Sequence, residues 1–230
     1  MSELEIFEKV ISFLEQHNLQ DKIMIAGSWA YYIYKNYYFK SELSPVALRT
    51  MDIDLYIPHD FKKKLHQHPP LDMKTEMEKL GFKEKKAQSP QGIYTQFYHQ
   101  DFKLEFITEQ TNNTSYGKGV LVYGLGITVN PIKNLEMINF PMPVKISDTL
   151  TLFVPEPEYF ALHKIYIAEK RTYEPKKQKD WSQAIDLLSL LKISKIKKAF
   201  VSLNKSVKKD IIENLKIKKL DEYIELLTKQ

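Results

Sequence analysis

The chain of 230 residues contains no cysteine and only seven glycines. The absence of cysteine excludes disulfide bonds, thiolate metal sites and cysteine nucleophiles. No apolar run approaches the roughly 18 residues that a helix needs to cross a bilayer. The N-terminal residues MSELEIFEKV lack a basic region followed by a hydrophobic stretch, so they do not resemble a signal peptide. Together these absences predict a cytoplasmic protein with no membrane partner.

Negative charge is the scarcer sign, with 29 acidic residues against 34 lysines and arginines, and the positive excess gathers near the C-terminus. Lysine dominates between Lys192 and Lys219. Such a cluster can bind nucleic acid or another anion, but it also occurs as the solvated face of short helices. Few aromatic residues and no arginine accompany these lysines, which favours the solvated face and leaves the binding surface open.

Hydrophobic periodicity predicts two halves of different character. The first half mixes an amphipathic helix over 2–18, capped by Ser2 and Glu5, with strands and further helices. Strands are expected at 22–26, 51–57, 93–98, 102–108, 127–129, 142–146 and 150–154, and helices at 29–38 and 72–80. After Pro155 and Pro157 only helical patterns remain: 158–171, 178–191 and three shorter stretches ending near 227. We therefore predict an α/β domain over 1–155 and an all-helical domain over 156–230.

Two aspartates provide the strongest chemical signal. In the strand 51–57, Ile53 and Leu55 point to one side, whereas Asp52 and Asp54 emerge together on the other. Two neighbouring carboxylates repel each other unless a cation lies between them. Magnesium prefers such oxygen ligands and leaves coordination positions for water and phosphate. The alternative is the solvent face of an edge strand, where similar pairs of aspartates also occur.

Two further features strengthen the case for a phosphate-handling site. Gly27-Ser28 ends a short apolar strand and begins a helix, where a close backbone approach and the helix N-terminus favour a phosphate. Its alternative is a plain turn in which Ser28 is the N-cap. Glu105 lies on the polar face of a strand that can pair with 51–57, and a third carboxylate would complete a two-metal site. Its alternative is an exposed carboxylate beside Lys103.

The set Gly27-Ser28, Asp52-Ile53-Asp54 and Glu105 resembles the pattern of the polymerase-beta-like nucleotidyltransferase superfamily. More narrowly, residues 49–55 (RTMDIDL), His163-Lys164 and residues 179–184 (KDWSQA) resemble a bacterial family of uncharacterised nucleotidyltransferase-fold proteins. The resemblance covers roughly residues 20–190. It departs from the superfamily in a longer glycine-to-aspartate spacing, which fits the narrower family, and in Ala26 where a second glycine is usual.

The resemblance implies a mixed sheet with flanking helices, followed by a helical domain, with the active site between the two. It also implies roles for individual residues. Asp52, Asp54 and Glu105 would bind Mg²⁺ or Mn²⁺ and carry the catalysis, with Glu105 assisting deprotonation of the acceptor. Gly27, Ser28 and Lys164 would hold the phosphates, while Lys179 and Asp180 would orient the nucleotide or the acceptor.

The residues of the helical half also have ordinary interpretations. Lys164 is expected on the polar face of its helix, so that it is either a triphosphate ligand or a surface lysine beside an apolar face. The alternative for Lys179 and Asp180 is the first turn of a helix, where an acid lies near the positive end of the helix dipole.

The implied reaction is transfer of a nucleoside monophosphate from a nucleoside triphosphate to a hydroxyl group. The acceptor stays open among RNA, a protein and a small molecule, and a toxin-like role rests on analogy alone. The competing hypothesis is a non-catalytic module of the same fold that binds nucleic acid or a protein through its lysine-rich C-terminal region. Retention of all three carboxylates favours the enzyme.

Overall fold

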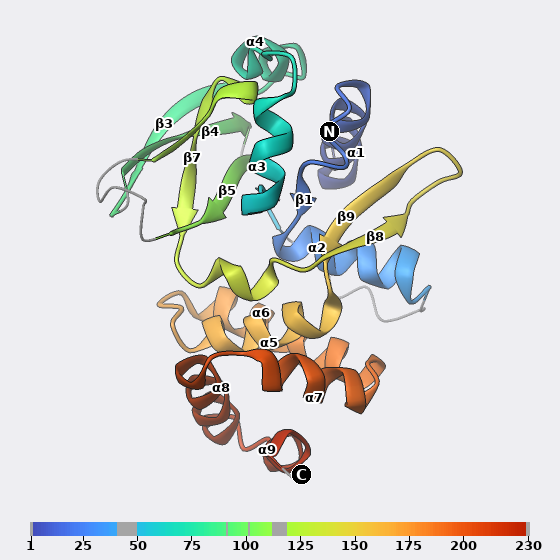
Figure 1. Ribbon diagram of the computed structural model, residues 1–230, viewed down its shortest axis with the longest axis vertical. Helices are drawn as coiled ribbons and strands as arrows, with labels where there is room; N and C mark the ends of the chain where they lie inside the picture. Colours follow the sequence, from blue (N-terminus) through green and yellow to red (C-terminus); the bar gives the residue numbers. More distant parts are fainter. Residues whose placement is uncertain (1, 41–49, 91, 101, 112–118, 229–230) are drawn as a thin grey trace. The chain divides into compact units, whose positions relative to one another are not determined.

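The computed structural model describes residues 2–40, 50–90, 92–100, 102–111 and 119–228; Arg49 of the aspartate motif lies outside them. The chain forms two compact units, Met1–Val154 and Pro155–Gln230. The first unit is a mixed α/β structure and the second is helical, so the predicted fold class is confirmed (Figure 1).

A mixed sheet organises the first unit. In the described residues it contains nine strands, seven of them in the order β3-β4-β5-β2-β1-β9-β8, while β7 pairs with β5 and with β6. The strands are β1 (Met24–Ile25), β2 (Asp52–Tyr56), β3 (Lys83–Ser89), β4 (Gly92–His99), β5 (Phe102–Glu109), β6 (Val120–Val122), β7 (Ile127–Ile132), β8 (Pro141–Lys145) and β9 (Thr151–Pro155). β2 lies in the interior of this sheet and not at its edge, which excludes the edge-strand interpretation of its two aspartates.

Helices and short helical turns complete the first unit. They are α1 (Glu3–Gln16), α2 (Gly27–Ile33) with a π-helical turn η1 (Tyr34–Tyr38), α3 (His59–His66), α4 (Met73–Lys79), and the 3-10 turns η2 (Tyr123–Leu125) and η3 (Leu135–Ile138). The predicted capping box of α1 is confirmed, because the Ser2 side chain accepts from the Glu5 amide and the Glu5 side chain accepts from the Ser2 amide. Trp29 of α2 stacks on Phe7 of α1 with ring centroids 3.9 Å apart, which fixes the start of α2 in the core.

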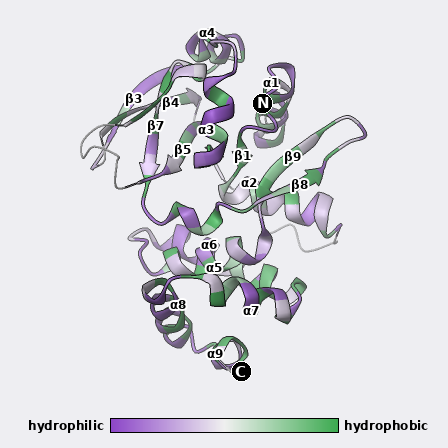
Figure 2. Ribbon diagram, in the orientation of Figure 1, coloured by the Kyte–Doolittle hydropathy of each residue, from purple (hydrophilic) through white to green (hydrophobic). Residues whose placement is uncertain are grey.

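β3 and α3 are among the elements that have no counterpart in the sequence prediction. β3 has the sequence KEKKAQS, without an apolar face, and its side chains are exposed or half-buried. It forms because β4 supplies a full antiparallel partner from Lys83–Tyr98 to Ser89–Gly92. α3 is largely hydrophilic, as its colouring in Figure 2 shows, and only Phe61 and Leu65 are buried.

The second unit consists of helices α5 (Pro157–Ala168), α6 (Glu174–Leu190), α7 (Ile193–Ser202), α8 (Lys205–Ile217) and α9 (Asp221–Thr228). α5 is buried along almost its whole length, from Pro157 to Tyr166, so it is the central helix of this unit. It packs against α6, α7 and α8. Among the described residues, no helix has both the length and the hydropathy to cross a bilayer.

Candidate active site

The acidic residues meet across two neighbouring strands, β2 and β5. These strands run parallel, with Asp52 opposite Lys103 and Asp54 opposite Glu105. Because paired residues of adjacent strands project to the same side of a sheet, all four side chains share one face. The predicted pairing of the two strands is thereby confirmed, and it places Glu105 beside the two aspartates.

Gly27 packs directly against one of these carboxylates. Its φ of +59° lies in the left-handed region, and a Cβ atom there would fall 2.2 Å from Oδ2 of Asp54. A backbone hydrogen bond also joins the two segments, because the Ala26 amide donates to the Asp54 carbonyl oxygen over 2.9 Å. Only glycine therefore allows the start of α2 and the Asp54 carboxylate to lie so close together.

Ser28 does not cap the helix. α2 begins at Gly27, its N-cap is Ala26, and no side chain caps it, which excludes the N-cap interpretation of Ser28. The Ser28 side chain is buried in the first turn. The first amides of any helix have no partner within the helix, so this turn carries donors for an anion. A phosphate-binding role for Gly27 and Ser28 stays a prediction.

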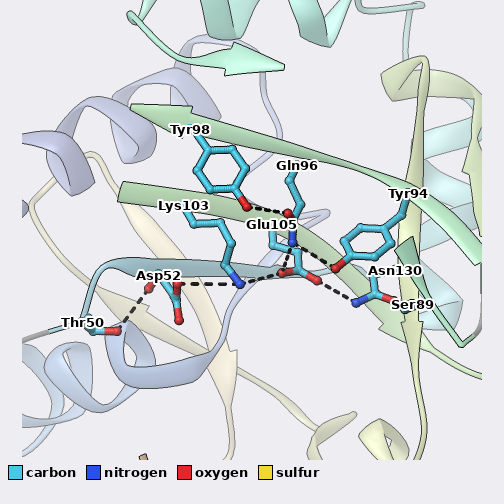
Figure 3. Close-up of polar contacts among 9 residues, drawn as sticks. All are labelled: Thr50, Asp52, Ser89, Tyr94, Gln96, Tyr98, Lys103, Glu105 and Asn130. Carbon is cyan, nitrogen blue, oxygen red and sulfur yellow. Dashed lines mark hydrogen bonds and ion pairs between the residues drawn. The ribbon is translucent and has the colours of Figure 1, made fainter. Parts of the chain in front are cut away.

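Glu105 is held by a network of hydrogen bonds from three strands (Figure 3). Asn130 of β7 donates to Glu105 Oε1 over 2.7 Å, and Gln96 of β4 donates to Oε2 over 2.9 Å. Gln96 is itself fixed, because Tyr98 donates to its Oε1 over 2.7 Å and its amide donates to the Tyr94 hydroxyl over 3.0 Å. Glu105 is only 5% exposed, so its carboxylate is oriented by the protein and not by solvent.

Lys103 is the charged residue of this site to which the sequence patterns assign no role. Its Nζ lies 2.9 Å from Glu105 Oε2 and 3.7 Å from Asp52 Oδ1. Burial alone lowers the pKa of Lys103, but attraction to Glu105 and Asp52 outweighs it and leaves the pKa above its ordinary value. The lysine is therefore a cation fixed within the acidic face.

Two of the three predicted metal ligands, Asp52 and Asp54, are placed to bind a metal ion together. Asp52 and Asp54 are half-buried and project together, and Gly27 leaves room for the Asp54 carboxylate, which suits one divalent ion. Within the described ranges no three acidic, histidine or cysteine side chains gather closely enough to hold one ion. Glu105, whose oxygens already accept from three side chains, stays a predicted third ligand.

The residues predicted from the helical half form a different kind of cluster. Lys164 of α5 donates to Asp180 Oδ1 of α6 over 2.6 Å, and Arg171 donates to Oδ2 over 2.9 Å. The Lys164 and Asp180 side chains are 6% and 2% exposed, respectively. This burial corrects the expectation that Lys164 lies on an open polar face. Asp180 lies in the second turn of α6, and Lys179 beside it is half-buried. Nucleotide contacts of these three residues stay predictions.

Among the solved structures similar to this chain are two nucleotidyltransferase-type proteins. An antigenic nucleotidyltransferase-like protein from Paracoccidioides brasiliensis has 17% sequence identity and a TM-score of 0.57, over 98% of this chain and 94% of that chain. ANT(2")-Ia in complex with adenylyl-2"-tobramycin has 15% identity and a TM-score of 0.45, over 86% of this chain and 95% of that chain. No curated protein matches the chain.

A protein-family model described as nucleotidyltransferase matches residues 6–208. The match spans both the sheet with Gly27, Asp52, Asp54 and Glu105 and most of the helical unit. The chain therefore belongs to this nucleotidyltransferase family and is a nucleotidyltransferase.

Proposed function

We propose that this enzyme transfers a nucleoside monophosphate from a nucleoside triphosphate to a hydroxyl group, and that the reaction depends on a divalent ion, Mg²⁺ or Mn²⁺. The observation that carries the proposal is the parallel register of β2 and β5, which puts Asp52, Asp54 and Glu105 on one face of the sheet. Asp52 and Asp54 would hold the ion, which supplies positive charge to the phosphates.

The proposed step exchanges one phosphorus–oxygen bond for another. The acceptor oxygen forms a bond to the α-phosphorus, the bond from that phosphorus to the bridging oxygen of the β-phosphate breaks, and pyrophosphate leaves. The acceptor hydroxyl releases its proton, for which Glu105 is the predicted acceptor or assistant. Charge neutralisation and positioning contribute most of the catalysis in such transfers.

The phosphates would lie against the first turn of α2. Gly27 brings the backbone of this turn to the Asp54 carboxylate, so an ion on Asp54 and a phosphate on the turn would be neighbours. Lys164, Lys179 and Asp180 remain proposed nucleotide or acceptor contacts. For Lys164 such a contact competes with its buried ion pair to Asp180. The acceptor is proposed only as a hydroxyl of RNA, a protein or a small molecule.

A thermal-shift screen of the four nucleoside triphosphates, each with and without Mg²⁺, tests the proposal. A ligand at 100 times its dissociation constant raises the free energy of unfolding by about 2.7 kcal/mol, or about 5–10 °C in melting temperature for a chain of this size. We expect such a shift with at least one triphosphate, only when Mg²⁺ is present, and we expect Asp52→Asn to abolish it. A triphosphate that binds should also release pyrophosphate when acceptor candidates are added.

The competing hypothesis, a non-catalytic module, gives a different result in the same screen. No triphosphate would then shift the melting temperature of the wild-type protein, and Asp52→Asn would behave like wild type. That outcome would remove the proposed activity, and the lysine-rich region from Lys192 to Lys219 would become the first binding surface to examine.

A further inference from the structure

Lys103 occupies an unusual place for a lysine on a strand. It stands opposite Asp52 and two residues before Glu105, and its amine lies between their carboxylates in Figure 3. The distances are 2.9 Å to Glu105 Oε2 and 3.7 Å to Asp52 Oδ1. A second divalent ion bridging the aspartate pair and Glu105 would need this same space.

The surrounding network keeps Glu105 directed at the lysine. Its Oε1 accepts from Asn130 and its Oε2 accepts from Gln96 as well as from Lys103. Rotating the carboxylate towards a metal would break at least one of these buried bonds, and a buried donor left without a partner costs about 1–3 kcal/mol. The Glu105 carboxylate is therefore oriented to bind the ammonium group of Lys103 and not an external cation.

Charge balance leads to the same conclusion. Three carboxylates share this face of the sheet, and the Lys103 ammonium lies within ion-pair distance of two of them, those of Glu105 and Asp52. At an effective dielectric constant near 20, a positive charge about 4 Å from a second cation repels it by about 4 kcal/mol per unit charge, and a divalent ion is repelled more strongly. An ion on Asp52 and Asp54 is repelled by Lys103 too, but it is attracted by two carboxylates, whereas an ion beside Glu105 would have to displace the ammonium from its nearest partner, 2.9 Å away.

We propose that Lys103 takes the place of the second cation in this site, so that the protein binds a single divalent ion with each nucleotide. Lys103 then supplies permanent positive charge beside the Asp52 carboxylate, and Glu105 is the positioning residue that holds it there, in place of the roles of third metal ligand and proton acceptor predicted for it above. This inference rests on the proposed function, because it assumes that Asp52 and Asp54 hold the first ion.

The test counts Mn²⁺ ions bound to the full-length protein by electron paramagnetic resonance, in the presence of the non-hydrolysable analogue α,β-methylene-ATP. Wild type should bind one Mn²⁺ per complex. Lys103→Met should bind two, the second at least about tenfold more tightly than any second ion in wild type, which corresponds to about 1.4 kcal/mol. Lys103→Arg retains the charge and should return the count to one.

Each result of this titration decides the matter. Two ions of similar affinity in wild type would overturn the proposal without any variant, so it stays testable even if Lys103→Met fails to fold. One ion in both wild type and Lys103→Met would overturn it as well, because the lysine would not be what excludes the second ion. Asp52→Asn separates the two levels of inference: if it retains all Mn²⁺ binding, the proposed function fails at its metal site, whatever Lys103 does.

Discussion

Removing the charge of Asp180 should destabilise the helical unit. Its carboxylate is 2% exposed and accepts from both Lys164 and Arg171. Burial alone raises the pKa of Asp180, but the two cations outweigh it and lower the pKa, so the group is charged at neutral pH. Asp180→Asn leaves the Lys164 ammonium buried without its anion, and we expect a loss of about 3–5 kcal/mol in urea unfolding.

Lys164→Met provides the matched control for this prediction. In that variant Asp180 retains Arg171, whose Nε lies 2.9 Å from Oδ2, so the loss of stability should be clearly smaller than in Asp180→Asn. Equal free energies of unfolding for Asp180→Asn and wild type would show that the pair contributes nothing to the fold. Lys164 and Asp180 would then be better explained as nucleotide ligands than as a structural ion pair.

Gly27 offers a second prediction at the same scale. Alanine at this position meets the Asp54 carboxylate and must adopt a positive φ. The conformation alone costs about 1–2 kcal/mol, and the clash displaces Asp54. We expect Gly27→Ala to weaken Mn²⁺ binding by about tenfold or more, an effect of about 1.4 kcal/mol measured by titration calorimetry.

Gly81→Ala is the control for Gly27→Ala. Gly81 also has a positive φ, of +87°, but the nearest atoms to an added Cβ belong to His99 and not to an acidic residue of the site. This variant should lose stability to a similar degree, yet bind Mn²⁺ like wild type. If Gly27→Ala also binds Mn²⁺ like wild type, the packing of Gly27 on Asp54 has no part in metal binding.

At the scale of elements, α5 should make the protein sensitive to acid. Burial lowers the pKa of His163 to about 3 from its usual 6.5, and the charge of Lys164 acts in the same direction. Between these two values the unfolded chain binds a proton that the folded chain does not, so stability falls as the pH drops from about 6.5 towards 3. The slope contributed is about 1.4 kcal/mol per pH unit.

Urea unfolding of wild type and His163→Gln between pH 7 and pH 4 measures this contribution. The glutamine cannot take up a proton, so once the two stability curves are aligned at pH 7, the wild-type curve should fall below that of His163→Gln as the pH drops. Parallel curves across the whole range would mean that His163 takes up its proton as readily in the folded protein as in the unfolded chain, so that its burial in α5 does not lower its pKa.

The elements also show where sequence patterns are informative. Alternation in 51–57 predicts that Asp52 and Asp54 share a face, because the period of a strand is a property of the backbone alone. The same pattern cannot predict β3, because its sequence KEKKAQS carries no apolar face and only its pairing with β4 makes it a strand. Helix α3 cannot be predicted from its apolar pattern either, because only Phe61 and Leu65 are buried in it.

At the scale of the whole molecule, the division into a mixed α/β half and a helical half is readable, since the strand patterns stop where Pro155 and Pro157 begin a helical region. The sequence alone identifies the carboxylates of the site. It does not identify the residues that bind them, because Gln96 and Asn130 meet Glu105 only through the strand order β4-β5 and the pairing of β7 with β5. The sequence places Lys103 only beside Glu105, because the register that brings it to Asp52 is a tertiary property.

The parallel pairing of β2 with β5 has a consequence for the order of events in folding. Asp52 and Lys103 are register partners separated by fifty intervening residues, and a parallel pair cannot be closed by a tight turn. Contacts between such distant segments form slowly, because loop-closure entropy opposes them until the rest of the sheet stabilises them. Helices such as α1 can form early from local contacts, whereas the acidic face cannot exist in any intermediate without the β2–β5 pair. A nascent chain still short of β5 would therefore carry both aspartates and lack the site, so that enzymatic competence appears only once synthesis has passed Glu109.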